Sequence, residues 1–295
     1  TSAASADVDG AATIATGGTW NLGTQQAFIG GTTTVNGPVT GNGTAAVVMD
    51  GAIGASLSGT SSLPALTIDK SPGIGVSLTT NLTVNGAFTL EGGTFTLSVS
   101  GTRTLTVNGS AALTGGELSY SSIGILDVNG NVTCSGAVCT FMPSIRCSGN
   151  WVGHAAFAPT SGGVVTFDGV GAQSVSGPAA FFDLTVAVGS VVTATGALDV
   201  NGALTLNGAL DTSGATADID GAATIATGGA WSLGTQQPTV GGTLIVNGPV
   251  TGSGAAAVVM DSTSGASLSG TSTLPALTID KSPGVGVSLT TNLTV

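Results

Sequence analysis

The stretch Leu82-Thr83-Val84-Asn85-Gly86 decides how the whole sequence is interpreted, because variants of it return along the chain. Leu105 to Gly109 repeats it unchanged, and Leu198 to Gly202 replaces the threonine with aspartate. Alternate side chains of a strand point to opposite faces, so the leucine and valine point to one side and the threonine to the other. Asn-Gly tolerates positive φ and favours a turn. Each such stretch is therefore predicted to be a short strand followed by a turn.

One position of this motif recurs along the chain at intervals near 20 residues. With Val84 as the reference, the equivalent residues are Val8, Ile29, Met49, Ile68, Val84, Val107, Val128, Cys147, Phe167, Val186, Val200 and Ile219. The 11 steps cover 211 residues, and repeats of about 20 residues are typical of chains whose units stack in one dimension. We therefore expect an all-β, parallel β-solenoid (β-helix) with about 19–20 residues per coil, right-handed coiling and little or no helix.

A longer period accompanies the short one. Residues 1–84 match residues 212–295 without a gap at an offset of 211, with 17 mismatches in 84 pairs. The short series continues in the duplicate through Val240, Met260, Ile279 and Val295. We expect residues 1–211 to form one full repeat unit of 11 coils and residues 212–295 to begin the next. The two would form a continuous rod without a domain boundary, within a longer chain of such units.

The residue after the reference position distinguishes a solenoid from a β-sandwich. This position holds Asn or Asp in many copies, among them Asn85, Asn108, Asn129, Asp168, Asn201 and Asp220. Identical positions stack ~4.8 Å apart in a parallel solenoid, where Asn and Thr side chains bond to their copies above and below. A sandwich also has short strands and frequent turns, but it has no reason to repeat residue types at one position.

Composition restricts the classes of partner and the location. Charged residues make up 6% of the chain, and the net charge is −11 with only four cations, Lys70, Arg103, Arg146 and Lys281. Such a surface repels phosphate backbones, so nucleic acid is excluded as a partner. No run approaches the ~18 apolar residues of a membrane helix, so we expect no membrane span in this segment. An acidic chain rich in Thr, Ser and Gly is typical of material outside a prokaryotic cell, and we expect an extracellular or cell-surface location.

A resemblance to a known class rests on residues 145–186. They contain Ile-Arg-Cys-Ser-Gly-Asn-Trp, then Gly-Gly-Val-Val-Thr-Phe-Asp-Gly and Phe-Phe-Asp-Leu-Thr-Val. This phrase resembles the Gly-Asn-Trp, Gly-Thr-Val-Thr-Phe-Asp-Gly and Phe-x-Asn-Leu-Thr-Ile repeats of very large bacterial surface proteins. The resemblance implies a parallel β-solenoid that serves as an adhesin, filament or envelope structure. The chain departs from the pattern by its cysteines and by Asp183, where Asn is usual.

Carboxylates offer one candidate cofactor site. Asp199 and Asp218 occupy the same position on neighbouring coils, with Asp220 close by. Carboxylate oxygens are the ligands that Ca²⁺ takes, so calcium is a candidate cofactor. The alternative is solvated surface acids, and the chain lacks the Gly-Gly-x-Gly-x-Asp repeat of calcium-bound β-rolls.

The three cysteines suggest a disulfide rather than a metal site. Cys134 and Cys139 flank Ser-Gly-Ala-Val, a spacing that a disulfide can close in an oxidising exterior. Three cysteines without a matched fourth ligand make a poor zinc pattern. Cys147 stands at an inward position, where we expect it to pack as a small hydrophobic side chain.

Nothing in the sequence predicts catalysis. Polysaccharide-cleaving solenoids need clustered carboxylates or a carboxylate with basic groups, whereas His154 is the only histidine and the basic residues are scattered. We therefore assign no catalytic, cofactor-binding or metal-binding residue and do not expect an enzyme. Asn-x-Ser/Thr triplets, which are acceptors for glycans, begin at Asn42, Asn81, Asn108, Asn131 and Asn292.

These features together predict a structural protein that forms an extracellular filament or rod-like stalk, acting as a mechanical scaffold or in adhesion. Its partners would be copies of itself, joined as covalent tandem repeats or by end-to-end and lateral association, and glycans. Eleven coils at ~4.8 Å would advance about 53 Å. The alternative is a polysaccharide-binding adhesin module on a solenoid spacer, although Trp20, Trp151 and Trp231 are too sparse for an aromatic platform.

Overall fold

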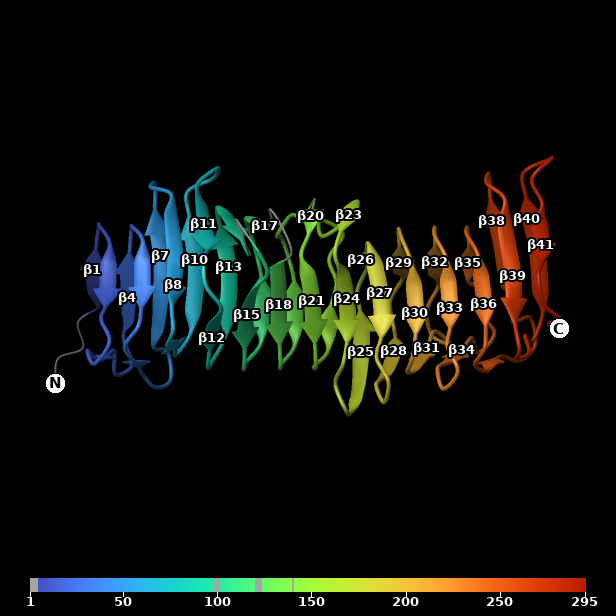
Figure 1. Cartoon of the computed structure of the whole chain (residues 1–295), viewed down its shortest axis with the longest axis horizontal. Helices are drawn as coiled ribbons and strands as arrows, with labels where there is room; N and C mark the ends of the chain where they lie inside the picture. Colours follow the sequence, from blue (N-terminus) through green and yellow to red (C-terminus); the bar gives the residue numbers. More distant parts are fainter. Residues whose placement is uncertain (1–4, 98–100, 120–123, 140) are drawn as a thin grey trace. The chain divides into compact units, whose positions relative to one another are not determined.

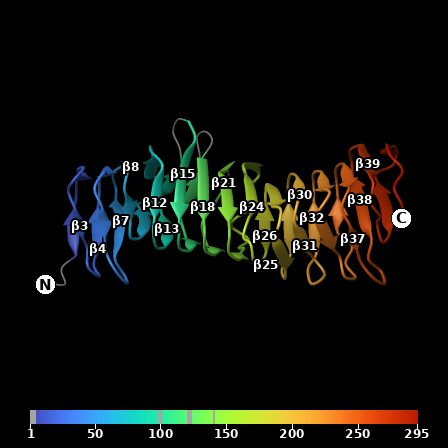
Figure 2. The same cartoon turned by 60° about the horizontal axis from the view of Figure 1, so that its bottom comes forward.

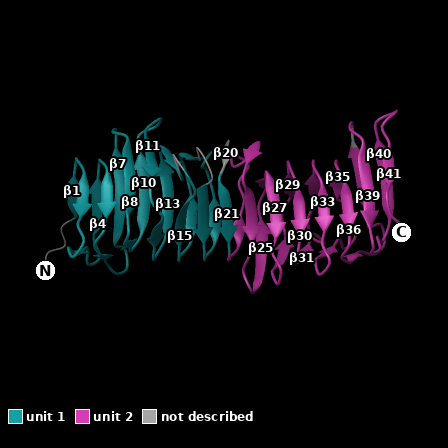
Figure 3. Ribbon diagram, viewed as in Figure 1, with its two compact units in different colours: residues 1–147 teal, residues 148–295 magenta. Residues whose placement is uncertain are grey.

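The computed structural model is an all-β, parallel β-solenoid of about 14 turns, as the sequence predicts (Figure 1). It describes residues 5–97, 101–119, 124–139 and 141–295, and none of these residues is helical. The chain divides into two compact units, Thr1–Cys147 and Ser148–Val295 (Figure 3). The division between them lies inside the 211-residue sequence repeat.

Each turn of the first unit contributes strands to three stacked faces, which we call faces A, B and C. Face A contains β1 (Ala6–Val8), β4 (Gln26–Ile29), β7 (Ala46–Gly51), β10 (Leu66–Lys70), β13 (Phe88–Gly92), β16 (Ala111–Leu113) and β19 (Val132–Cys134). Face B contains β2 (Ala12–Ile14), β5 (Thr33–Val35), β8 (Ala55–Gly59), β11 (Gly75–Leu78), β14 (Thr94–Thr96) and β17 (Glu117–Ser119). Face C begins with β3 (Trp20–Asn21) and β6 (Val39–Thr40), which form a two-stranded sheet of their own. It continues with β9 (Ser62–Leu63), β12 (Leu82–Val84), β15 (Arg103–Val107), β18 (Gly124–Val128) and β21 (Ser144–Cys147), and β20 (Phe141–Met142) precedes β21.

The second unit repeats this design with faces D, E and F (Figure 2). Face D contains β22 (Trp151–Val152), β25 (Ala172–Ser176), β28 (Val191–Ala194), β31 (Ala209–Asp211), β34 (Ala230–Ser232) and β37 (Val250–Thr251). Face E contains β26 (Ala179–Phe181), β29 (Leu198–Val200), β32 (Ala217–Ile219), β35 (Thr239–Val240), β38 (Val258–Ser262) and β40 (Leu277–Lys281). Face F contains β24 (Val164–Phe167), β27 (Asp183–Val186), β30 (Leu204–Leu206), β33 (Ala223–Ile225), β36 (Leu244–Val246), β39 (Ala266–Gly270) and β41 (Val287–Leu289), and β23 (Ser161–Gly162) precedes β24.

Strand pairing within each unit is parallel and follows the predicted columns over long stretches. Val8, Ile29, Met49 and Ile68 are successive register partners on face A. Val84, Val107, Val128 and Cys147 are successive partners on face C. The series from Val200 through Ile219, Val240 and Met260 to Ile279 follows face E. Each turn therefore supplies the backbone partners that its neighbours need.

Two steps of the predicted column are wrong. Ile68 pairs with Leu90 rather than Val84, because Val84 belongs to face C. Val186 pairs with Leu206 rather than Val200, which belongs to face E. Each mistaken step advances two strands instead of three, because all faces share the same strand–turn motif. The 211-residue offset therefore contains about ten and one-third turns instead of 11, and at ~4.8 Å per turn it advances about 50 Å.

Buried apolar columns fill the interior of each unit. Leu63, Val84, Val107 and Val128 are fully buried on face C, where each contacts its equivalents on the adjoining turns. The core of the second unit contains a cluster of aromatic side chains around Trp151. Its ring meets those of Phe157, Phe167 and Phe181 edge-on, with centroid distances of 5.8, 6.4 and 5.2 Å.

Gly59 and Gly270 occupy the same position in the two copies of the duplicated segment and meet the same constraint. Their φ angles are 139° and 145°. A Cβ added at either glycine would lie 2.0 Å from a backbone oxygen, that of Val35 or Val246. Any side chain would block this approach of one turn to the preceding one, so the duplicate preserves glycine here.

Candidate functional surfaces

An asparagine ladder runs along the outside of the first unit, next to face C. The Asn85 amide donates to Ser62 Oγ at 3.0 Å, Asn108 donates to Asn85 Oδ1 at 3.3 Å, and Asn129 donates to Asn108 Oδ1 at 3.0 Å. The ladder predicted for the position after the reference is therefore confirmed for these turns. Each link holds two turns in one register, because a slip of one residue breaks the amide chain.

A buried lysine links three consecutive turns of face A. The Lys70 side chain is 2% exposed, and its ammonium donates to Gly30 O at 2.6 Å and to Asp50 O. Asp50 lies on β7, one turn before Lys70, and Gly30 lies just after β4, two turns before it. Burial lowers the pKa of Lys70, and the Asp50 carboxylate opposes that shift. The Lys70 side chain therefore joins three turns of the stack, and we call a lysine with this pair of contacts a lysine pin.

The duplicate builds the same contact a second time. Lys281 donates to Gly241 O at 2.7 Å and to Asp261 O, the equivalents of the two oxygens that Lys70 contacts. Lys281 is half-buried, because no described turn follows β40 on face E. Over Lys70, in contrast, the next turn places Gly93, where an added Cβ would lie 2.5 Å from Lys70 Cβ. The glycine is what lets that turn close over the lysine.

The predicted carboxylate stack exists on face E. Asp199 and Asp218 are register partners on adjoining turns. Burial raises the pKa of Asp199, and the charges of Asp218 and Asp220 raise it further. The Thr239 hydroxyl donates to Asp218 Oδ1. In the part of the chain that the structure describes, no group of three or more His, Cys, Asp or Glu residues is arranged to hold a metal, and calcium binding stays a prediction.

The cysteines lie inside the first unit. Cys134 and Cys139 are buried and unbridged in the structure. Burial raises the pKa of the Cys139 thiol to about 12, helped by the Glu117 carboxylate, and raises that of Cys134 further, helped by Cys139 and Cys147. Cys147 is fully buried, and its thiol lies 4.0 Å from Gly130 O. The Cys134 and Cys139 thiols are therefore protonated at neutral pH and poorly reactive.

Two of the three tryptophans lie in the core, and the histidine lies at the surface. Trp151 and Trp231 are fully buried, so neither ring is available as a platform for a sugar. The Trp231 indole donates to Thr212 Oγ1 at 3.0 Å. His154 is exposed, and its Nδ1 accepts a hydrogen bond from Ala156 N at 3.2 Å. None of these contacts brings together an acid, a base and a nucleophile.

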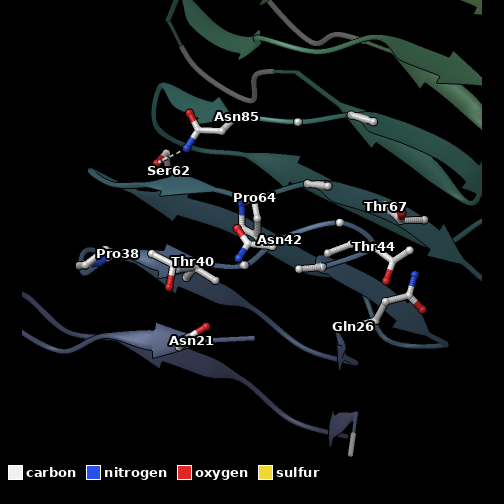
Figure 4. A pocket seen from close by; sticks show the side chains of 18 of the residues that line it. Asn21, Gln26, Pro38, Thr40, Asn42, Thr44, Ser62, Pro64, Thr67 and Asn85 are labelled. Atoms are coloured by element: carbon white, nitrogen blue, oxygen red, sulfur yellow. Dashed lines mark hydrogen bonds between the residues drawn. The ribbon is translucent and has the colours of Figure 1, made fainter. Parts of the chain in front are cut away.

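An open groove of about 930 Å³ lies at the corner of the first unit where face C passes into face A (Figure 4). Its lining comes from four consecutive turns, within residues 21–26, 38–46, 62–67 and 85–89, and none of the lining residues is charged. In Figure 4, Asn42 and Pro64 lie in the middle of the view, and Asn85 with its partner Ser62 lies toward one side.

Comparisons with protein-family models, with curated proteins and with solved structures find no match to this chain. The described residues contain no helix long and apolar enough to cross a membrane. The fold defines the class of β-solenoid proteins, and a fold alone does not define a function.

Proposed function

We propose that this chain is a structural module of an extracellular filament or stalk at a prokaryotic cell surface, which provides length and mechanical support. The scarcity of charge and the resemblance of residues 145–186 to repeats of very large bacterial surface proteins support this class and location. The asparagine ladder and the lysine pins support it as well, because they join turns along the stack rather than form a site for chemistry. The proposal includes no catalytic step.

The apolar surface that one turn buries against the next carries the proposal. Among the described strands, β40 pairs only with β38 and β41 only with β39. Ile279 and Leu289 are 55% and 61% exposed, whereas their equivalents at the 211-residue offset, Ile68 and Leu78, are fully buried. Identical local sequences thus show how much apolar surface a following turn covers.

The partner that fits this edge is another solenoid turn. In the first unit, Ile68 is covered by β13, whose Leu90 is its register partner. β40 and β41 are the last strands of their sheets, and an edge strand can pair through its backbone with a further strand, which would bury the exposed apolar side chains in the same step. In this proposal, further copies of the solenoid, in the same chain or in another, extend the stack.

Replacing Ile279 with lysine tests this association. Ile279 is 55% exposed on the last described turn of face E, so Ile279→Lys should leave the fold intact while placing a charge where a following turn would pack. The lost burial of one isoleucine, about 1.5–3 kcal/mol, predicts an association constant lowered about tenfold or more. Sedimentation equilibrium of the wild type and the variant measures it.

Ile53→Lys is the matched control, because Ile53 is 64% exposed at the tip of the connection between β7 and β8. This variant adds the same charge away from the edge and should associate like the wild type. Equal association of all three proteins, or none by the wild type, would contradict end-to-end stacking through β40 and β41.

A further inference from the structure

The groove at the corner of faces C and A has the length and the rigidity of a binding site. It spans four turns, which at ~4.8 Å per turn places its ends about 14 Å apart and fits an extended chain rather than a compact molecule. Its wall, the loop between β6 and β7, is held in place by Asn42 N donating to Gly23 O at 2.6 Å and by Thr44 Oγ1 donating to Thr24 O at 2.7 Å. The groove is therefore formed before any ligand arrives.

The chemistry of the lining selects a neutral, hydroxyl-rich ligand. Within the described part of the chain, the side chains of Gln26, Asn42 and Thr67 make no hydrogen bond to the protein, and all three line the groove. Amide and hydroxyl groups both donate and accept, as do the hydroxyls of a sugar. Pro38 and Pro64 add apolar surface for the C–H faces of a ring. The net charge of −11 disfavours an anionic chain.

The duplicated segment supplies an internal comparison. At the 211-residue offset, Asn21, Asn42 and Thr44 are replaced by Ser232, Ser253 and Ala255. The amide of Gln237, the equivalent of Gln26, donates to Ala255 O at 2.9 Å and is thereby occupied. The second copy keeps the backbone of the groove wall but offers fewer polar groups, so the two copies differ in binding chemistry and not in fold.

We propose that the groove of the first unit binds an uncharged oligosaccharide. The ligand lies along the stack, so that successive sugar rings meet successive turns, and the amides of Gln26 and Asn42 bond its hydroxyls. This role is independent of end-to-end stacking, because the groove lies on the side of the first unit and the uncovered edge belongs to β40 and β41.

The test measures binding of oligosaccharides to the whole chain. An array of neutral glucans, mannans, galactans and N-acetylglucosamine oligomers, with uronic acid oligomers beside them, would identify a ligand, and calorimetry would give its Kd. The variant Asn21→Ser/Asn42→Ser/Thr44→Ala carries residues that the second copy already tolerates, so we expect it to fold. Its Kd should be raised about tenfold or more.

A control variant follows the same design outside the groove. Thr19→Ala/Ile53→Ser also copies residues of the second copy, and it should keep the wild-type Kd. Binding of a neutral oligosaccharide that the groove variant loses and the control keeps supports the proposal. No binding of any neutral oligosaccharide, a preference for uronic acids, or equal binding by the groove variant overturns it.

Discussion

Lys70→Met is expected to lower the free energy of unfolding by about 2 kcal/mol. Methionine fills a similar volume but leaves Gly30 O and Asp50 O without the ammonium that they accept from. Hydrogen bonds to charged groups contribute ~1.5–3 kcal/mol each, and relief of the buried charge offsets part of their loss. Urea denaturation at neutral pH, followed by circular dichroism, measures the difference.

Lys281→Met is the matched control for this substitution. It removes the same pair of contacts in the same local sequence, but Lys281 is half-buried and solvent can replace its bonds. We expect a loss of about 1 kcal/mol or less. If both variants lose equal stability, or if Lys70→Met loses none, the buried pin is not what joins these turns.

The pH dependence of the free energy of unfolding gives a second test of the burial of Lys70. Because burial lowers the pKa of Lys70, the folded protein releases this proton at a lower pH than the unfolded chain does. In the interval just below the ordinary lysine pKa, the unfolded state then binds more protons, so the stability of the wild type should rise with pH. Lys70→Met should lack this rise.

The other large effect on the free energy of unfolding is expected when Leu244 is replaced by threonine, the residue that its equivalent, Thr33, has in the first copy. These residues are equivalent in the two copies and fully buried, and Thr33 Oγ1 has no hydrogen-bond partner. Their register neighbours are the same residue types, Ala and Leu. Leu244→Thr should lower the free energy of unfolding by about 3 kcal/mol, because it removes buried apolar surface and buries an unpaired hydroxyl.

The reverse substitution should stabilise the protein. Thr33→Leu removes the unpaired hydroxyl from a site whose duplicate accommodates leucine, and we expect a gain of about 1–2 kcal/mol. Thr34→Ile is the control, because it copies Ile245 at the neighbouring, half-buried position and should change stability by about 0.5 kcal/mol or less. Denaturant midpoints of Leu244→Thr, Thr33→Leu and Thr34→Ile measure these changes in stability. A destabilised Thr33→Leu would mean that the two cores differ in shape.

The fold class followed from the sequence because its signals are local. Alternation in Leu82-Thr83-Val84 indicates a strand, Asn85-Gly86 indicates a turn, and recurrence near 20 residues predicts stacking. Alternation does not say which of three faces a strand joins, because every face carries the same motif. The predicted column is therefore wrong after Ile68 and after Val186, whose register partners in the structure are Leu90 and Leu206.

The surfaces were predictable to different degrees. The ladder of Asn85, Asn108 and Asn129 followed from stacking alone. The lysine pin was missed, although Lys70 and Lys281 match at the 211-residue offset in a chain with four cations, which was an available signal. The groove draws its lining from four turns, with Gln26 and Asn42 on two of them, and sequence spacing does not show that these turns line one site.

Electron cryomicroscopy of the purified chain tests the central claim most directly. A structural module that stacks through β40 and β41 should form filaments with a layer spacing of ~4.8 Å along the axis, since parallel strands pair at that distance across every junction. Isolated particles at all protein concentrations, or assemblies without that axial spacing, would contradict the account.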